Sequence, residues 1–93
     1  MQEKKIKGTV PSLRLDAIMG VGFSCSRSKA AQYIKEGQIR VNGDKISDPS
    51  RNIKEEEIIE WEGHGEISLI EVGGETKKGR LRVSIKRVRK KED

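Results

Sequence analysis

The stretch SCSRSKAAQYIKEGQIRVNGDKI, residues 24–46, predicts a short helix that stops abruptly and is followed by a tight hairpin. Ser24 and Ser26 are both suitable N-caps for this helix, because a serine hydroxyl can accept a hydrogen bond from a free backbone amide. Gly37 provides the left-handed residue at which helices commonly end. The Asn-Gly pair at residues 42–43 predicts a two-residue hairpin turn, because both central residues of such a turn need a positive φ.

A second, shorter helix is predicted upstream of this stretch. Ser12 precedes the segment LRLDAIM, so its hydroxyl can cap a helix that runs through about Met19. Gly20 and Gly22 are expected to end it, and Phe23 is expected to enter the core between the two helices.

The rest of the chain has the pattern of strands. Residues 57–63 read as one strand, and residues 66–72 and 80–88 read as the two arms of a hairpin around residues 73–79. In the last of these segments apolar residues alternate with basic or hydroxyl-bearing ones. The sequence therefore predicts an α+β domain, with two short N-terminal helices packed on a small antiparallel or mixed β-sheet.

The length of 93 residues fits one domain. We expect residues 1–11 to be a flexible N-terminal segment or linker, residues 12–88 to form the domain, and residues 89–93 to be a frayed basic tail. Cys25 is the only cysteine, which excludes an internal disulfide and indicates a reducing compartment. No long apolar run or signal peptide is present, so a cytoplasmic location is expected.

The net charge of +5 favours a polyanionic partner. The negative charge is concentrated in the middle of the chain, and if the sheet separates it from the basic elements, one side of the molecule suits RNA. The carboxylates of this acidic region are Glu55, Glu56, Glu57, Glu60, Glu62 and Glu66.

The second helix carries a polar stripe, because Ser28, Gln32 and Lys35 follow one another at i, i+4 and i+7. Arg27 lies in its first turn, where free backbone amides can bind a phosphate together with the serine hydroxyls. The alternative is an ordinary solvated face with a capping serine.

The two hairpins add further basic residues. The turn at residues 42–43 places Arg40 opposite Lys45, which is unfavourable without a bound anion, although both side chains can also splay into water. The second hairpin has the tip TKKGR, whose lysines can equally protect a sheet edge against aggregation. The basic residues of this tip are Lys77, Lys78 and Arg80.

Catalytic groups are scarce. His64 is the single histidine, and together with Cys25 it is too little for a zinc site of the usual kind. We therefore expect no enzyme activity, no cofactor, no metal and no small-molecule substrate.

Three motifs are similar to the S-four-type RNA-binding domain, which is named after a ribosomal protein and contains the αL motif. They are RLD at residues 14–16, SRSKA at residues 26–30 and IKEGQIRVNG at residues 34–43. The resemblance covers Ser12 to Trp61 and implies that two helices and the following hairpin form one RNA-contacting unit.

The flanking segments, residues 12–18 and 73–85, resemble the C-terminal domain of the YlmH-type proteins. These are bacterial cytoplasmic proteins linked to the ribosome and to the rescue of stalled large subunits. The resemblance implies that an RNA surface falls on the helices, and we include the neighbouring Lys29 in it. The expected contacts are Arg14, Arg27, Ser28, Lys29, Gln32 and Lys35.

The sequence is thus interpreted as a monomeric, non-catalytic module that binds structured RNA, either ribosomal RNA or tRNA in a complex with the large ribosomal subunit. We expect Arg14, Arg27 and Lys35 to contact phosphates, and Ser28 and Gln32 to hydrogen-bond the sugar or backbone. Two alternatives stay open: a protein–protein adaptor on the ribosome, or an accessory domain of an RNA-modifying enzyme. A second, more electrostatic set of contacts is expected from Arg40, Lys45, Arg51, Lys77, Lys78 and Arg80.

Overall fold

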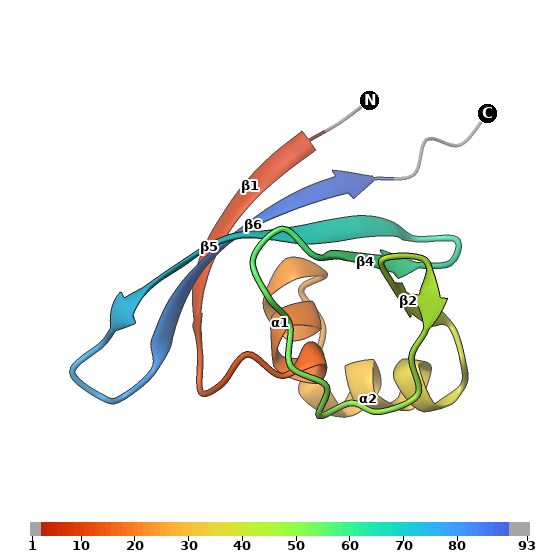
Figure 1. Cartoon of the computed structure of the whole chain (residues 1–93), viewed down its shortest axis with the longest axis horizontal. Coiled ribbons are helices and arrows are strands. Elements are labelled where there is room, and N and C mark those ends of the chain that lie inside the picture. Colours follow the sequence, from red (N-terminus) through yellow and green to blue (C-terminus); the bar gives the residue numbers. More distant parts are fainter. Residues whose placement is uncertain (1–2, 90–93) are drawn as a thin grey trace.

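The computed structural model describes residues 3–89 as two helices and a six-stranded antiparallel sheet (Figure 1). The predicted α+β class is confirmed, and the sheet is antiparallel rather than mixed. Its strand order is β1-β6-β5-β4-β2-β3. Along the chain the elements are β1 (Glu3–Val10), α1 (Leu15–Gly22), α2 (Arg27–Lys35), β2 (Ile39–Val41), β3 (Asp44–Lys45), β4 (Ile58–Trp61), β5 (Gly65–Glu75) and β6 (Leu81–Arg89).

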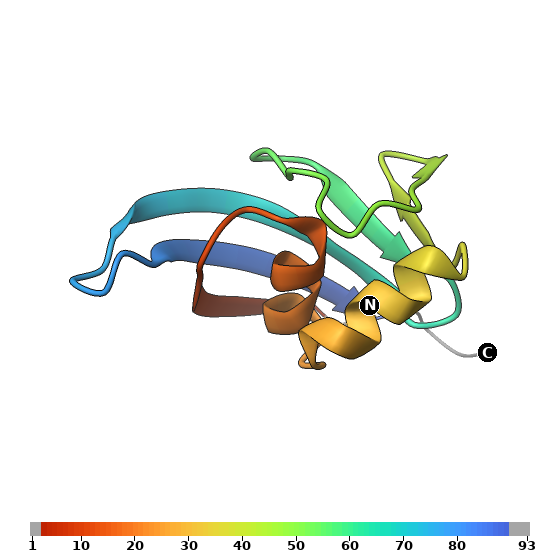
Figure 2. The same cartoon turned by 90° about the horizontal axis from the view of Figure 1, so that it is seen from below.

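Both helices cover the same face of the sheet (Figure 2). The core lies between the two layers and is built largely from aliphatic side chains of both helices and of β2, β4, β5 and β6. Gly22 allows the close approach of α1, because a Cβ atom there would lie only 2.5 Å from the Cδ1 atom of Ile67. The helix includes Gly20 and ends at Gly22, so it is about three residues longer than predicted.

The start of α1 differs from the prediction that Ser12 caps it. The helix begins at Leu15, whose amide donates to the Arg51 carbonyl at 2.8 Å. The next amide, that of Asp16, donates to the Pro49 carbonyl at 3.2 Å. Carbonyl groups of a distant loop therefore satisfy the first helical amides, and the predicted serine cap is wrong.

The structure of residues 24–46 agrees with the prediction. Ser26 caps α2, since its Oγ accepts from the Lys29 amide at 3.1 Å, and Gly37 follows the helix with a φ of +80°. The hairpin turn has positive φ at both central residues, and it pairs Arg40 with Lys45. These signals are local, so the sequence alone was sufficient to place them.

The prediction that residues 1–11 are a flexible segment or linker is wrong for residues 3–10. Residues 3–10 form β1, which pairs with β6 along its whole length, and Val10 is buried in the core. An edge strand needs few apolar residues, which is why EKKIKGTV does not show the usual strand pattern. At the other end, Arg89 is the last residue of β6, and the rest of the predicted tail lies outside the described residues.

Candidate nucleic-acid interface

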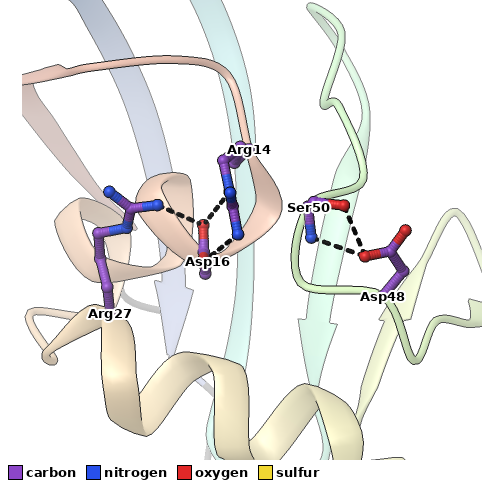
Figure 3. A network of polar contacts seen from close by, with 5 residues as sticks. All are labelled: Arg14, Asp16, Arg27, Asp48 and Ser50. Carbon is purple, nitrogen blue, oxygen red and sulfur yellow. Dashed lines mark hydrogen bonds and ion pairs between the residues drawn. The ribbon is translucent and has the colours of Figure 1, made fainter.

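A buried carboxylate joins the two helices. Asp16 lies in the first turn of α1 and is 5% exposed. Its Oδ1 and Oδ2 accept from Nε and Nη2 of Arg14 at 3.2 and 3.1 Å, and Oδ1 also accepts from Nη2 of Arg27 at 3.3 Å (Figure 3). Both arginine side chains stay over 40% exposed. Because two guanidinium groups share one carboxylate, the cluster has a net positive charge. Because both arginine side chains are exposed, that charge is accessible to a ligand.

The arginine cluster continues into the exposed face of α2. Lys29 lies at the edge of this face, about 60° further round the helix than Gln32. The Gln32 amide donates to Glu36 at 3.1 Å, so a carboxylate is present beside the stripe. The other exposed polar residues fall within an arc of about 140°, at about 100° per residue, and they are Arg27, Ser28, Gln32 and Lys35.

A loop that follows the first hairpin supports the cluster. Asp48 accepts at Oδ1 from the amide and the hydroxyl of Ser50, at 2.9 and 2.7 Å (Figure 3). These hydrogen bonds, together with the nearby charge of Arg14, lower the pKa of Asp48 below its ordinary value. The same loop supplies the carbonyl groups that hold the start of α1, so it fixes the backbone from which Arg14 projects.

Asp16 and Asp48 were not among the predicted site residues. The sequence signal for Asp16 was its position in the RLD motif, two residues after Arg14. Its contact with Arg27 joins two helices and could not be derived from local spacing. The structure thus brings Arg14 and Arg27 together through a residue that carries the opposite charge.

The cations of the first hairpin diverge. Arg40 donates from Nη1 to the Gly43 carbonyl at 3.4 Å, within its own turn. Lys45 extends toward the end of α2, where a Cβ atom on Gly37 would lie 3.6 Å from its Nζ. The splayed arrangement considered for this pair is therefore the one observed, and no bound anion is needed to explain it.

Arg51 forms a structural ion pair. Its Nη2 lies 3.2 Å from Oε2 of Glu57, which also accepts from Asn42 at 3.2 Å. The other oxygen of Glu57 accepts from the Lys54 amide at 2.7 Å. Burial opposes ionisation of this carboxyl, but the amide and the guanidinium outweigh it and lower the pKa of Glu57. The charge of Arg51 is therefore compensated, and the acidic region is not fully separated from the basic one.

The tip of the second hairpin lies away from the helix surface. Figure 1 and Figure 2 both place it at the opposite end of the molecule from α2. Lys77 and Lys78 are exposed there. Arg80 folds back onto β1, with Nε donating to the Thr9 hydroxyl at 3.0 Å and Nη2 to the Thr9 carbonyl at 2.9 Å. These residues do not extend the cluster around Asp16.

The two residues considered for catalysis, Cys25 and His64, both pack against other side chains of the fold. Cys25 is half-buried against the core, and burial raises the pKa of its thiol above the ordinary value. His64 stacks on Trp61 with ring centroids 4.0 Å apart.

Within residues 3–89, no group of three or more His, Cys, Asp or Glu side chains is arranged to hold a metal ion. In the same part of the chain, no helix is long and apolar enough to cross a membrane.

Comparison with known families and curated proteins gives consistent matches. The model of the S4 domain matches residues 13–59. The chain is 38% identical over 79 residues to the Ribosome-associated protein quality control protein P2 of Bacillus subtilis, covering 85% of this chain and 31% of that protein. It is 37% identical over 59 residues to the small ribosomal subunit protein uS4 of Koribacter versatilis, covering 61% of this chain and 28% of the relative. The chain thus spans about a third of the length of these relatives.

Two solved structures are also similar. The crystal structure of a pseudouridylate synthase matches with a TM-score of 0.53 and 30% identity, over 57% of this chain and 23% of that chain. The crystal structure of the 30S ribosomal protein S4e from Thermoplasma acidophilum matches 96% of this chain and 40% of that chain, with a TM-score of 0.50 and 16% identity. At that identity the second match supports the fold alone.

Proposed function

The chain belongs to the S4 domain family, and from this membership we propose that it is a non-catalytic module that binds structured RNA. The resemblance drawn from the three sequence motifs is confirmed by the family match. The observation that carries the proposal is the convergence of Arg14 and Arg27 on the buried Asp16, beside the polar face of α2.

The expected mode of binding follows from the groups on this surface. Arg14, Arg27 and Lys35 contact phosphates, while Ser28 and Gln32 hydrogen-bond sugar or backbone atoms. Base stacking has little support, because the aromatic rings of this region pack against one another instead of standing free. Recognition through phosphates and shape is the usual mode for double-helical RNA, whose base edges are hard to reach.

The curated relatives favour a ribosomal partner. One is described as ribosome-associated and another is a protein of the small ribosomal subunit. We therefore propose that the bound RNA is ribosomal RNA or tRNA in a ribosomal complex in the cytoplasm, with the large subunit as the expected site and a monomer as the binding form. The proposal covers RNA binding alone, because the chain spans about a third of the length of these relatives.

The proposal is tested by titrating purified large-subunit ribosomal RNA with the chain at several salt concentrations. Each phosphate contact contributes about −0.7 to −0.9 to the slope of log K against log salt. Lys35→Glu and Arg27→Gln are expected to weaken binding and flatten this slope. Lys54→Glu is the matched control for Lys35→Glu, because Lys54 is exposed and lies outside the α2 face. Equal affinities and slopes for all four proteins would refute the proposal.

A role as an accessory domain of an RNA-modifying enzyme is the second candidate. The specific observation in its favour is the 30% identity to part of a pseudouridylate synthase structure. Both candidates use the same RNA surface, so mutations there cannot separate them. Sequencing the parent reading frame can, because a catalytic domain in the same polypeptide would support the accessory role.

A protein–protein adaptor is the third candidate, and one feature of the sheet favours it. Glu60 lies directly opposite Glu66 in the β4–β5 pair and opposite Arg40 in the β2–β4 pair, so two carboxylates share one neighbouring cation. A basic protein segment would supply further positive charge. An adaptor of this kind would be insensitive to Lys35→Glu but weakened by Glu60→Gln in a pull-down of ribosomal proteins.

A further inference from the structure

The face of the sheet opposite the helices carries a second set of basic residues. In an antiparallel pair, directly opposed residues project to the same side, and successive residues alternate between sides. Ile85 of β6 is buried under the helices, and Arg87 points the same way, with its guanidinium carbon 5.6 Å from the Phe23 ring centroid. The alternate residues therefore project from the helix-free face, in the opposed pairs Lys5 with Lys86, Lys7 with Ser84, and Thr9 with Arg82.

Part of this face is hollowed. A shallow hollow of about 410 Å³ is lined on this side by residues of β1, β5 and β6. Arg80 donates the two hydrogen bonds described above to Thr9, which lines the hollow, so the Arg80 side chain lies at the edge of the hollow. Ammonium, guanidinium and hydroxyl groups commonly bind phosphate in proteins. The side chains that line the hollow are Lys7, Thr9, Glu71, Arg82 and Ser84.

The cations of this face are only weakly compensated. Lys86 lies 3.8 Å from Glu3, and both side chains of that pair are about half exposed. Among the described residues, Lys7 and Arg82 have no carboxylate within ion-pair distance. The one carboxylate in the hollow belongs to Glu71 of β5, directly opposite Ser84. An anion is therefore expected to bind on the β1–β6 side of the hollow.

We propose that this surface, the β1–β6 face formed by Lys5, Lys7, Arg80, Arg82 and Lys86, binds a second segment of the sugar-phosphate backbone of the bound RNA. The inference rests on the proposed RNA-binding function and adds a contact region to it. The sheet separates this face from the cluster around Asp16, so one phosphate cannot touch both surfaces. The two faces therefore hold two backbone segments on opposite sides of the domain.

The composition of the face favours nucleic acid over a protein partner. The exposed large apolar side chains of the described residues, Ile58 and Ile70, lie on β4 and on the neighbouring strand β5, and neither lies on β1 or β6. The centres of protein–protein interfaces are enriched in aromatic residues and depleted in lysine. A row of cations and hydroxyls along two neighbouring strands instead fits a regular row of phosphates.

The test uses the full 93-residue chain, with purified large-subunit ribosomal RNA as the probe. Lys7→Glu and Arg82→Glu each change the charge by the same amount as the control, Lys54→Glu. Each is expected to lower the affinity at least about fivefold relative to that control, and to reduce the salt slope by about 0.7–0.9. Melting curves check the fold, and Lys7→Gln and Arg82→Gln replace the charge reversals if either of these lowers the melting temperature.

Including Lys35→Glu separates this inference from the proposed function. If Lys35→Glu weakens binding while both β1–β6 variants match Lys54→Glu, the second contact is overturned and the proposed function stands. If none of the three differs from the control, both are overturned. If the β1–β6 variants weaken binding and Lys35→Glu does not, the second contact is supported and the assignment of the α2 face falls.

Discussion

Nη2 of Arg27 lies 3.3 Å from Oδ1 of Asp16, a buried residue eleven positions earlier in the chain. Arg14 binds the same carboxylate through two further hydrogen bonds, so one acid sets the positions of two cations from separate elements. Ordering a flexible side chain on binding costs about 0.5–1.5 kcal/mol. Because Asp16 orders both arginines beforehand, it should favour RNA binding even though its own charge repels phosphate.

Asp16→Asn separates these two effects. The substitution keeps the volume but removes the charge that holds Arg14 and Arg27, so we expect RNA affinity to fall at least about threefold. The free energy of unfolding should fall by about 1–2 kcal/mol, because hydrogen bonds to an ionised group are lost while the exposed arginines can turn to water. RNA titration and urea unfolding measure the two quantities.

The matched control is Asp44→Asn, which also removes one negative charge but lies exposed in β3. Its net positive charge rises equally, and its RNA affinity should stay the same or increase slightly. If Asp16→Asn binds RNA more tightly than the wild-type chain, net charge governs binding and the ordering role of Asp16 is wrong.

Glu57 links stability to acid pH. Its pKa in the folded state is below the ordinary value of 4.5. The ionised form therefore stabilises the folded chain above pH 4.5, and that contribution is lost as the pH falls through the folded-state pKa. We expect Glu57→Gln to be less stable than wild type at neutral pH and to lose less stability on acidification. Urea unfolding between about pH 7 and pH 3 measures this, with the exposed Glu62→Gln as control; parallel curves for wild type and Glu57→Gln would contradict it.

The accuracy of the sequence-based predictions depended on how local the interactions were. The cap at Ser26, the stop at Gly37 and the turn at residues 42–43 each involve residues within a few positions, and all three are found. The start of α1 was wrong because its amides bond to carbonyl groups more than thirty residues away. The contact of Arg80 with Thr9, 71 positions earlier, was not predicted either. Such contacts follow from topology, which spacing along the chain does not contain.

Asn42 does more than form a turn. Its Oδ1 accepts from the Ile58 amide at 2.9 Å, and its Nδ2 donates to Glu57 at 3.2 Å, so it fastens the hairpin to β4. Asn42→Gly keeps the positive φ but removes both bonds, and we expect it to lower the free energy of unfolding by about 1–2 kcal/mol. Urea unfolding measures the change. An unchanged midpoint would mean that only the backbone conformation of the turn matters.

Deleting residues 1–10 tests whether β1 belongs to the domain. The deletion removes the buried side chain of Val10, whose burial alone contributes about 1.5–3 kcal/mol. It also leaves β6 as an open edge, which favours aggregation. We therefore expect a loss of at least about 2 kcal/mol in the free energy of unfolding and a lower solubility. A second chain, in which a Gly-Ser linker replaces residues 3–10, keeps the length but cannot supply Val10, and it should be equally destabilised. If both variants unfold at the same urea concentration as the full chain, the strand contributes nothing and the segment is a linker after all.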